Sequence, residues 1–153
     1  MTQYTSSTRT RGPFQWLALI IGIVYLLIGI AGFFVTGFDG FTEHDHDQTL
    51  LGFAINPLHN IVHILIGLLG LSLWSRPGGA RTFGWLLVLG YGAAFIYGLF
   101  AVDNPDINFL NINAADNWLH ILSVLAGLVI ALWPRKHADT HVDTTTPGPQ
   151  RQY

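Results

Sequence analysis

The chain has 153 residues, of which 50% are hydrophobic and only 10% are charged, and its formal net charge is -2. This composition is too apolar for a water-soluble domain of this size and predicts one small domain inside a lipid bilayer. The sequence contains no cysteine, which excludes disulfides, thiolate catalysis and cysteine-ligated clusters. It also has no basic patch with interleaved aromatic residues, so we expect no nucleic-acid partner.

The charged residues alternate in sign from one connection to the next. The basic residues lie in three short segments between long apolar runs: Arg9 and Arg11; Arg76 and Arg81; Arg135, Lys136 and Arg151. Acidic residues fill the other connections: Asp39, Glu43, Asp45, Asp47, Asp103, Asp106 and Asp116. Because loops rich in Lys and Arg stay on the cytoplasmic side, this alternation predicts four membrane crossings with both termini in the cytoplasm.

The charge pattern divides the chain into two tails and a membrane domain. We expect a polar cytoplasmic tail at residues 1–12, a four-span membrane domain at 13–134 and a disordered cytoplasmic tail at 135–153. The expected spans are residues 14–35, 53–74, 83–102 and 113–133. Each has about 20 residues, or roughly 30 Å of helix, which matches the hydrocarbon thickness. The predicted fold is therefore all-α, an integral membrane four-helix bundle.

The loop after the first span, residues 36–52, contains the run Glu43-His44-Asp45-His46-Asp47. Alternating carboxylates and imidazoles are ligands for Zn, Cu or Ni, so His44 and His46 are candidate metal ligands. Short clusters of this kind also occur in solvated loops that bind nothing. The sequence leaves both interpretations open.

The second span carries polar residues on one helical face. Five residues follow one another at steps of four and three and therefore share a stripe: Asn56, Asn60, His63, Gly67 and Gly70. Asn56 is a favourable helix cap, and Pro57 fits the first helical position. The pattern predicts a helix that begins at this pair and presents one polar stripe to the bundle interior.

The same stripe returns in the fourth span. The segment INPLHNIVHILIGLLGL from Ile55 aligns without gaps to INAADNWLHILSVLAGL from Ile112, and nine of the 17 positions are identical. The repeated asparagines, which we expect to form a structural polar core, are Asn56 and Asn60, and Asn113 and Asn117. The repeat predicts two tandem two-helix units related by a pseudo-two-fold axis along the membrane normal.

The first and third spans resemble each other less. The letters FQWL beginning at Phe14 have a weak echo in FGWL beginning at Phe83. Gly90, Ala94 and Gly98 form a small-residue face on the third span, and such faces let helices approach closely in lipid. This face can pack within the chain or against another one, so a homo-oligomer or a partner in a membrane complex remains open.

His63 and His120 each lie seven residues after a capping asparagine, about 10 Å into the outer half of the bilayer. A polar residue at that depth is costly unless it is paired, and it normally faces the bundle interior. In the structural interpretation, His and Asn side chains bond across helices and hold the bundle in register, each contributing roughly 0.6–2 kcal/mol. We expect the three span tyrosines to pack with their hydroxyls bonded to a backbone carbonyl or a histidine: Tyr25, Tyr91 and Tyr97.

Three other functions remain open for the histidines. His63 and His120 at equal depth could bind a haem axially and support electron transfer. The metal interpretation uses a set of nitrogen and oxygen ligands for Zn, Cu or Fe: His59, His63, His120 and Asp116. A small transporter would instead have a water-filled path along the polar stripe.

The stretch NPLHNIVHILIGLLG at residues 56–70 and the later NWLH at residues 117–120 resemble a family of small bacterial four-span membrane proteins, domain of unknown function 4383. The resemblance covers about residues 14–133 and leaves out both tails. It implies a multi-pass protein of the bacterial cytoplasmic (inner) membrane, with the lipid bilayer as its partner, and it implies no activity. Because the sequence has no nucleophile or phosphate-binding motif, we expect a non-enzymatic protein of unspecified role.

Overall fold

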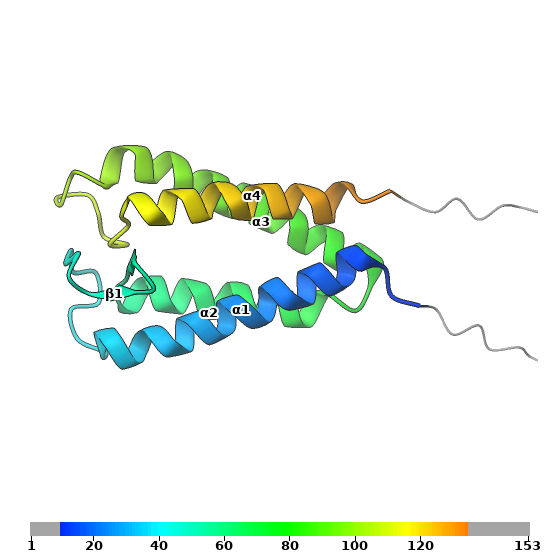
Figure 1. The fold of residues 1–153 in the computed structure, drawn as a ribbon, viewed down its shortest axis with the longest axis horizontal. Coiled ribbons are helices and arrows are strands. Elements are labelled where there is room, and N and C mark those ends of the chain that lie inside the picture. Colours follow the sequence, from blue (N-terminus) through cyan, green and yellow to red (C-terminus); the bar gives the residue numbers. More distant parts are fainter. Residues whose placement is uncertain (1–9, 135–153) are drawn as a thin grey trace, which may run out of the picture.

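The computed structural model describes residues 10–134, which form four helices and one short β-hairpin. The elements are α1 (Pro13–Thr36), β1 (Thr49–Leu50), β2 (Phe53–Ala54), α2 (Pro57–Leu73), α3 (Pro77–Ala101) and α4 (Ala114–Leu132), as Figure 1 shows. The expected all-α four-helix fold is confirmed. The disordered tail expected at residues 135–153, and residues 1–9 of the other tail, lie outside the described residues.

Three of the helices, α1, α3 and α4, are long and apolar enough to cross a membrane. Helix α2 is shorter, because its 17 residues give only about 25 Å of helix. It begins at Pro57 after the Asn56 cap, whereas the expected span began at residue 53. Helix α3 begins at Pro77, ahead of the expected start at residue 83, because the proline occupies the first helical position and the glycine-rich turn continues as helix.

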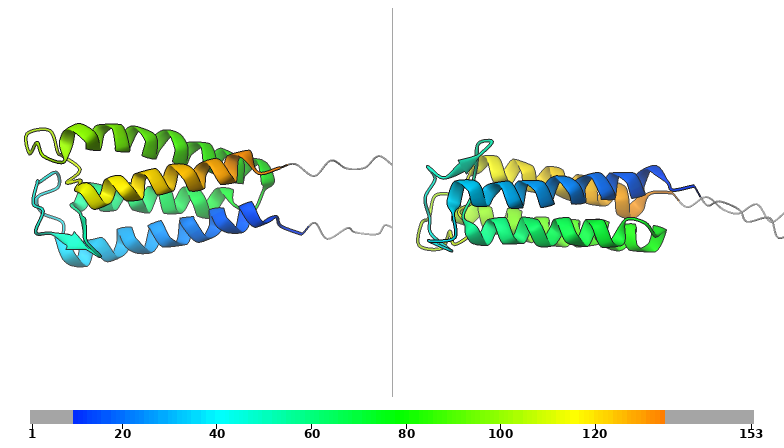
Figure 2. Two further views of the ribbon diagram at one scale, coloured as in Figure 1. Left: turned by 45° about the horizontal axis from the view of Figure 1, so that its top comes forward. Right: turned by 90° about the horizontal axis from the view of Figure 1, so that it is seen from below.

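The four helices form two antiparallel hairpins. Helix α1 packs against α2 and α3 packs against α4 along their lengths, while contacts between the hairpins are sparse. Figure 2 shows the two hairpins lying side by side. Both ends of the described chain lie at one end of the bundle, here called the terminal end, and the β-hairpin and residues 102–113 lie at the opposite, loop end.

Glycines allow the helices within each hairpin to approach closely. A Cβ atom added at Gly22 would lie 3.0 Å from the Cα atom of Gly70. In the second hairpin, a Cβ atom added at Gly84 would lie 2.7 Å from the carbonyl oxygen of Gly127. Because lipid tails are as apolar as leucine side chains, backbone packing of this kind is a main source of helix association in membranes.

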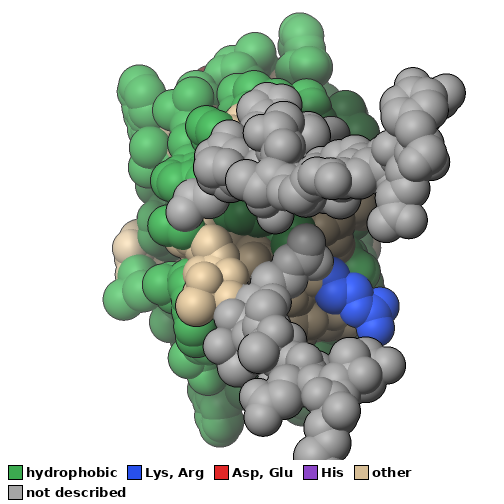
Figure 3. Space-filling view, turned by 90° about the vertical axis from the view of Figure 1, so that its right-hand side faces the viewer, with side chains coloured by type: hydrophobic (Ala, Val, Ile, Leu, Met, Phe, Trp, Pro, Cys, Tyr) green, Lys and Arg blue, Asp and Glu red, His purple; other side chains and the backbone are tan. Residues whose placement is uncertain are grey.

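The bundle interior changes from apolar to polar along its length. Near the terminal end the buried side chains are apolar apart from Gln15, and they include Phe14, Ala18, Phe83, Leu87 and Ile130. Towards the loop end they include histidines, tyrosines and asparagines. The outer surface is apolar, with Leu27, Phe34, Leu89 and Leu122 between 59% and 89% exposed. Figure 3 views the terminal end and shows hydrophobic side chains around its periphery. Such a surface requires lipid or protein around it.

At the terminal end, a side chain from the first helix of each hairpin satisfies carbonyl groups at the end of the second. Gln15 Nε2 donates to the carbonyls of Trp74 and Ser75 at 3.1 and 2.9 Å. The guanidinium of Arg81 donates to the carbonyls of Ala131 and Trp133 at 3.0 and 2.6 Å. These bonds pair groups that otherwise stay unsatisfied at a helix C-terminus, and they fix the register of each hairpin.

Candidate functional site

Asparagine caps begin both of the helices that carry the polar stripe. Asn56 Oδ1 accepts from the backbone N–H of His59 at 2.9 Å. Asn113 Oδ1 accepts from the N–H of Asp116 at 3.1 Å, and Asp116 Oδ2 accepts from the N–H of Asn113 at 2.9 Å. The expected capping role is confirmed for both asparagines. These caps place the next turns of α2 and α4, which carry the histidines, at matching depth.

The other two stripe asparagines pack against glycines of the neighbouring helix. The Asn60 side chain fills the space where a Cβ atom of Gly32 would lie, and Asn117 does the same at Gly98. Asn60 Nδ2 donates to the hydroxyl of Thr36 at 3.0 Å. Each asparagine therefore lies within its own hairpin, and neither bonds across to the other.

Five aromatic side chains meet between the four helices, and we call them the ring cluster: Tyr25, His59, His63, Tyr91 and His120. Ring centroids lie 5.1 Å apart for Tyr25 and His63, 5.3 Å for the two tyrosines, and 5.4 Å for Tyr91 and His120. His59 and His63 lie 4.4 Å apart on α2. None of the five rings is more than 5% exposed. The histidines that the sequence singled out thus meet in the bundle interior.

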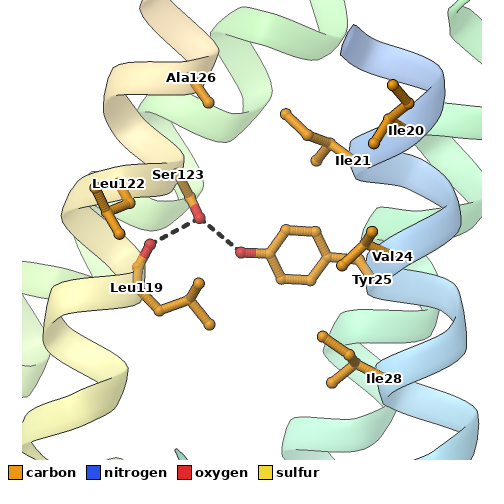
Figure 4. A pocket seen from close by; sticks show the side chains of 9 residues that line it. All are labelled: Ile20, Ile21, Val24, Tyr25, Ile28, Leu119, Leu122, Ser123 and Ala126. Atoms are coloured by element: carbon orange, nitrogen blue, oxygen red, sulfur yellow. Dashed lines mark hydrogen bonds between the residues drawn. The ribbon is translucent and has the colours of Figure 1, made fainter. Parts of the chain in front are cut away.

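Among residues 10–134, a hydrogen-bond partner is found for Tyr25 but not for Tyr91. The hydroxyls of Tyr25 and Ser123 lie 2.6 Å apart, and Ser123 Oγ donates to the carbonyl of Leu119 at 2.8 Å. Because the serine hydrogen is used on Leu119, Tyr25 is the donor in the first bond. Figure 4 shows Tyr25 reaching from α1 to Ser123 on α4. The Tyr91 hydroxyl is buried without a partner among residues 10–134.

A cavity of about 110 Å³ adjoins the ring cluster. Its polar lining is His59, His63, Tyr91 and His120, and its apolar lining is Val62, Ile66, Gly90, Ala94, Leu110 and Ile112. Pockets for drug-sized ligands measure roughly 300–1,000 Å³, so the space between the two histidines does not match a haem macrocycle. It matches a few water molecules or one small chemical group.

The histidines facing this cavity have unpartnered nitrogen atoms. Nδ1 of His59, of His63 and of His120 is buried and makes no hydrogen bond within the described chain. Buried polar atoms are rarely left unpaired, because each costs about 1–3 kcal/mol. The three Nδ1 atoms are therefore available to bond a water molecule or a polar group in the cavity.

The candidate metal ligands do not form a ligand set. Within residues 10–134, no group of three or more His, Asp and Glu side chains is placed to hold a metal ion. Asp116 uses one carboxylate oxygen in the cap of α4. In the loop, the His44 and His46 rings lie 4.4 Å apart, and His46 Nε2 donates to the carbonyl of Ile112 at 3.2 Å. The His46 side chain thus links the loop after α1 to the loop between α3 and α4.

Two further asparagines, whose role was not predicted from the sequence, close the loop end above the ring cluster. Asn111 Nδ2 donates to the carbonyls of Asp45 and Ile55 at 2.7 and 2.9 Å, and its Oδ1 accepts from Asp45 N–H at 3.0 Å. Asn108 bonds both backbone groups of Ile112 at 2.8 Å. Asn111 has a positive φ of 54°, which asparagine tolerates better than most residues. Ser123 was also missed, although its spacing of three from His120 places it on the same helical face.

Equivalent contacts recur in the two hairpins at constant sequence separations. Tyr25 contacts His63 and Tyr91 contacts His120, which separates the tyrosines by 66 positions and the histidines by 57. Gln15 and Arg81, which each bond carbonyls at the C-terminal end of the neighbouring helix, are likewise 66 positions apart. The echo between FQWL and FGWL has a separation of 69 and does not relate residues with equivalent contacts.

Comparison with known proteins shows the family of the chain. A family model described as a domain of unknown function, DUF4383, matches residues 15–133, a range that includes the ring cluster and nearly all of the four helices. No curated protein and no solved structure matches the chain. The resemblance expected from the NPLH and NWLH segments is thus confirmed, and the chain belongs to the DUF4383 family.

Proposed function

We propose that the chain is a non-enzymatic multi-pass protein of the bacterial cytoplasmic membrane, in which the buried ring cluster and its serine partner hold two helical hairpins together. The apolar surface of all four helices supports the placement in lipid. The short α2 is compatible with crossing because a bilayer thins locally around a short helix at modest cost.

The Tyr25–Ser123 hydrogen bond is the observation that carries this proposal. Glycine contacts hold α1 on α2 and α3 on α4, but the hairpins make few contacts with each other. Apolar side chains gain little by leaving lipid for a protein interior, so polar and close-packed contacts determine how hairpins associate. The hydrogen bond from Tyr25 on α1 to Ser123 on α4 is a polar contact between the hairpins, and it lies at the ring cluster.

The charge distribution supports an orientation. Arg11, Arg76 and Arg81 lie at the terminal end, whereas the loop end carries acidic residues such as Asp39 and Asp103. Loops rich in Lys and Arg remain in the cytoplasm. The proposal therefore has four spans, with the terminal end cytoplasmic and the ring cluster in the outer half of the membrane.

The haem, metal and transporter alternatives receive no comparable support. The cavity is small for a haem, and His59, His63, His120 and Asp116 do not converge as a metal-ligand set. Phe83 and other buried apolar side chains lie between the ring cluster and the terminal end. The polar stripe therefore does not continue across the bundle.

Thiol labelling tests the orientation, and the cysteine-free sequence makes this direct. Single cysteines are introduced at exposed positions: Thr42→Cys and Asp103→Cys at the loop end, and Ser75→Cys at the terminal end. In intact cells, a membrane-impermeant maleimide is expected to label the first two variants. The Ser75→Cys variant should react only after the cells are permeabilised. Labelling of the Ser75→Cys variant in intact cells would refute the four-span topology. So would a lack of labelling of either the Thr42→Cys or the Asp103→Cys variant.

A further inference from the structure

The two hairpins meet along two lateral grooves, which differ in the side chains that line them. The groove between α1 and α4 has a volume of about 210 Å³ and an almost entirely apolar lining, with the Tyr25–Ser123 pair at its base. Figure 4 shows the isoleucine and leucine side chains around that pair. The other groove, between α2 and α3, leads to the cavity beside the ring cluster and reaches the surface at Gly90, which is exposed.

The second groove has small residues where the first has branched ones. At the separation of 66 that relates Tyr25 to Tyr91, Gly90 stands where α1 has Val24, and Ala94 where α1 has Ile28. Val24 and Ile28 line the first groove with branched side chains. A Cβ atom added at Gly90 meets no atom within 4 Å, so the space beside this glycine is empty of protein.

The second groove also lacks the serine that pairs the tyrosine in the first. At the separation of 57 that relates the two histidines, Ile66 occupies the position of Ser123. An isoleucine has no hydroxyl, so Tyr91 has no counterpart of the bond that Tyr25 makes. Its hydroxyl meets no hydrogen-bond criterion with any group of residues 10–134, and the side chain is only 4% exposed.

The lining of the cavity defines the chemistry of its ligand. None of the ten lining residues is Asp, Glu, Lys or Arg, and the polar groups are three imidazoles and one phenol. Burying a charged group there without a counter-charge is costly, which favours an uncharged ligand. Carbonyl and hydroxyl oxygens are suitable partners, because both accept a hydrogen bond from the Tyr91 hydroxyl and a hydroxyl also donates to an imidazole nitrogen.

We propose that the cavity between α2 and α3 binds the head of a membrane-dissolved amphiphile, an uncharged group carrying a hydroxyl or carbonyl oxygen. The head enters laterally past Gly90 and Ala94, because the asparagine-bonded loops close the cavity from the loop end. The apolar tail remains in lipid beside Val62 and Ile66. This inference rests on the proposed membrane placement and adds a ligand class to the ring cluster.

Photolabelling in nanodiscs of phosphatidylcholine tests the inference. The probe is a fatty alcohol that carries a diazirine next to its hydroxyl end, and a diazirine alkane of equal length serves as the headless probe. We expect the alcohol probe to label residues on the cavity, with Tyr91 among them, and unlabelled alcohol to compete. The parent alkane and the corresponding fatty acid anion should not compete.

Two valine substitutions on the same helix provide a matched comparison. Gly90→Val fills the entrance to the cavity, whereas Gly92→Val places the same side chain in open space away from the cavity lining. Gly90→Val should reduce labelling at Tyr91 at least about tenfold, the factor that corresponds to 1.4 kcal/mol of affinity. Gly92→Val should label like the parent chain, and equal unfolding midpoints would show that both variants fold.

A second variant tests the unused hydroxyl. Ile66→Ser introduces the serine that Tyr25 already has in the other groove, so Tyr91 gains a partner and should bind the probe more weakly. Unchanged labelling in both Gly90→Val and Ile66→Ser would overturn the inference. The inference would also be overturned if the alcohol probe labelled the exposed helix faces but not Tyr91. That result would still be compatible with the membrane placement. If the alkane probe fails to label the exposed helix faces, the membrane placement is wrong and the inference is overturned with it.

Discussion

The hydrogen bond between Tyr25 and Ser123 links α1 to α4, and removing its two halves is predicted to have unequal effects. In Ser123→Ala, the buried Tyr25 hydroxyl loses its acceptor. In Tyr25→Phe, the serine keeps its bond to the carbonyl of Leu119 at 2.8 Å. Ser123→Ala therefore leaves the buried Tyr25 hydroxyl without a hydrogen-bond partner, whereas Tyr25→Phe leaves no hydroxyl unpaired.

The size of the asymmetry follows from the cost of a stranded group. Leaving a buried hydroxyl unpaired costs about 1–3 kcal/mol, whereas a paired one contributes about 0.5–1.5 kcal/mol net. Hydrogen bonds between membrane helices average about 0.6 kcal/mol and reach about 1.7. We expect Ser123→Ala to lower the free energy of unfolding by about 1–2 kcal/mol and Tyr25→Phe by about 0.5–1 kcal/mol. The double variant strands no hydroxyl, so its loss should be close to that of Tyr25→Phe alone.

Reversible unfolding in mixed micelles of nonionic detergent and dodecyl sulfate, followed by circular dichroism, measures these differences. Tyr91→Phe is the matched control, because it removes a buried hydroxyl that has no hydrogen-bond partner among residues 10–134. It should leave the free energy of unfolding unchanged or raise it. The reasoning is refuted if Tyr25→Phe costs more than Ser123→Ala, if the double variant shows the sum of both losses, or if Tyr91→Phe is as costly as Tyr25→Phe.

Two further predictions concern packing and capping, and the same unfolding assay measures both. Gly84→Ala places a methyl group 2.7 Å from the backbone oxygen of Gly127 and should lower the free energy of unfolding by about 1–3 kcal/mol. The control Gly92→Ala places the same group in open space and should leave the free energy of unfolding unchanged. Equal losses in the two variants would show that the glycine contact does not hold the hairpin together. Asn56→Ala removes the α2 cap together with bonds to two loop carbonyls and should cost about 1–2 kcal/mol. Asn104→Ala in the exposed loop should cost less than half as much, and a larger loss there would contradict the importance of the cap.

Much of the fold was predictable because its main determinants act over short distances in the sequence. Apolar segment length gave the number of helices, and Asn56 with Pro57 gave the start of α2. The start of α3 was harder, since the pair of glycines after Pro77 is typical of a turn and helix formation there depends on the proline and on packing. Local signals therefore gave the existence of the helices more reliably than their ends.

The candidate site was only partly predictable, because its contacts join distant parts of the chain. Equal spacing from the caps predicted that His63 and His120 lie at the same depth. Nothing in a single helix shows that Tyr25 reaches Ser123, since that depends on how the hairpins are placed. The separation of 66 between the tyrosines was likewise hidden, because few residues of α1 and α3 are identical at that spacing and the FQWL echo favoured a different one.

The difference between the two lateral grooves is informative because their surroundings are otherwise alike. Each contains a tyrosine from the first helix of a hairpin that packs on a histidine of the second helix. One tyrosine is hydrogen-bonded at the base of an apolar groove, and the other lies beside a histidine-lined cavity, where its hydroxyl has no hydrogen-bond partner among residues 10–134. If the buried rings served only to hold the hairpins together, pairing both tyrosines would give more stability than pairing one. Tyr91, which has no hydrogen-bond partner among residues 10–134 and has Gly90 beside it, therefore supports the proposed ligand-binding role of the α2–α3 side, whereas the bonded pair on the α1–α4 side supports the proposed structural one.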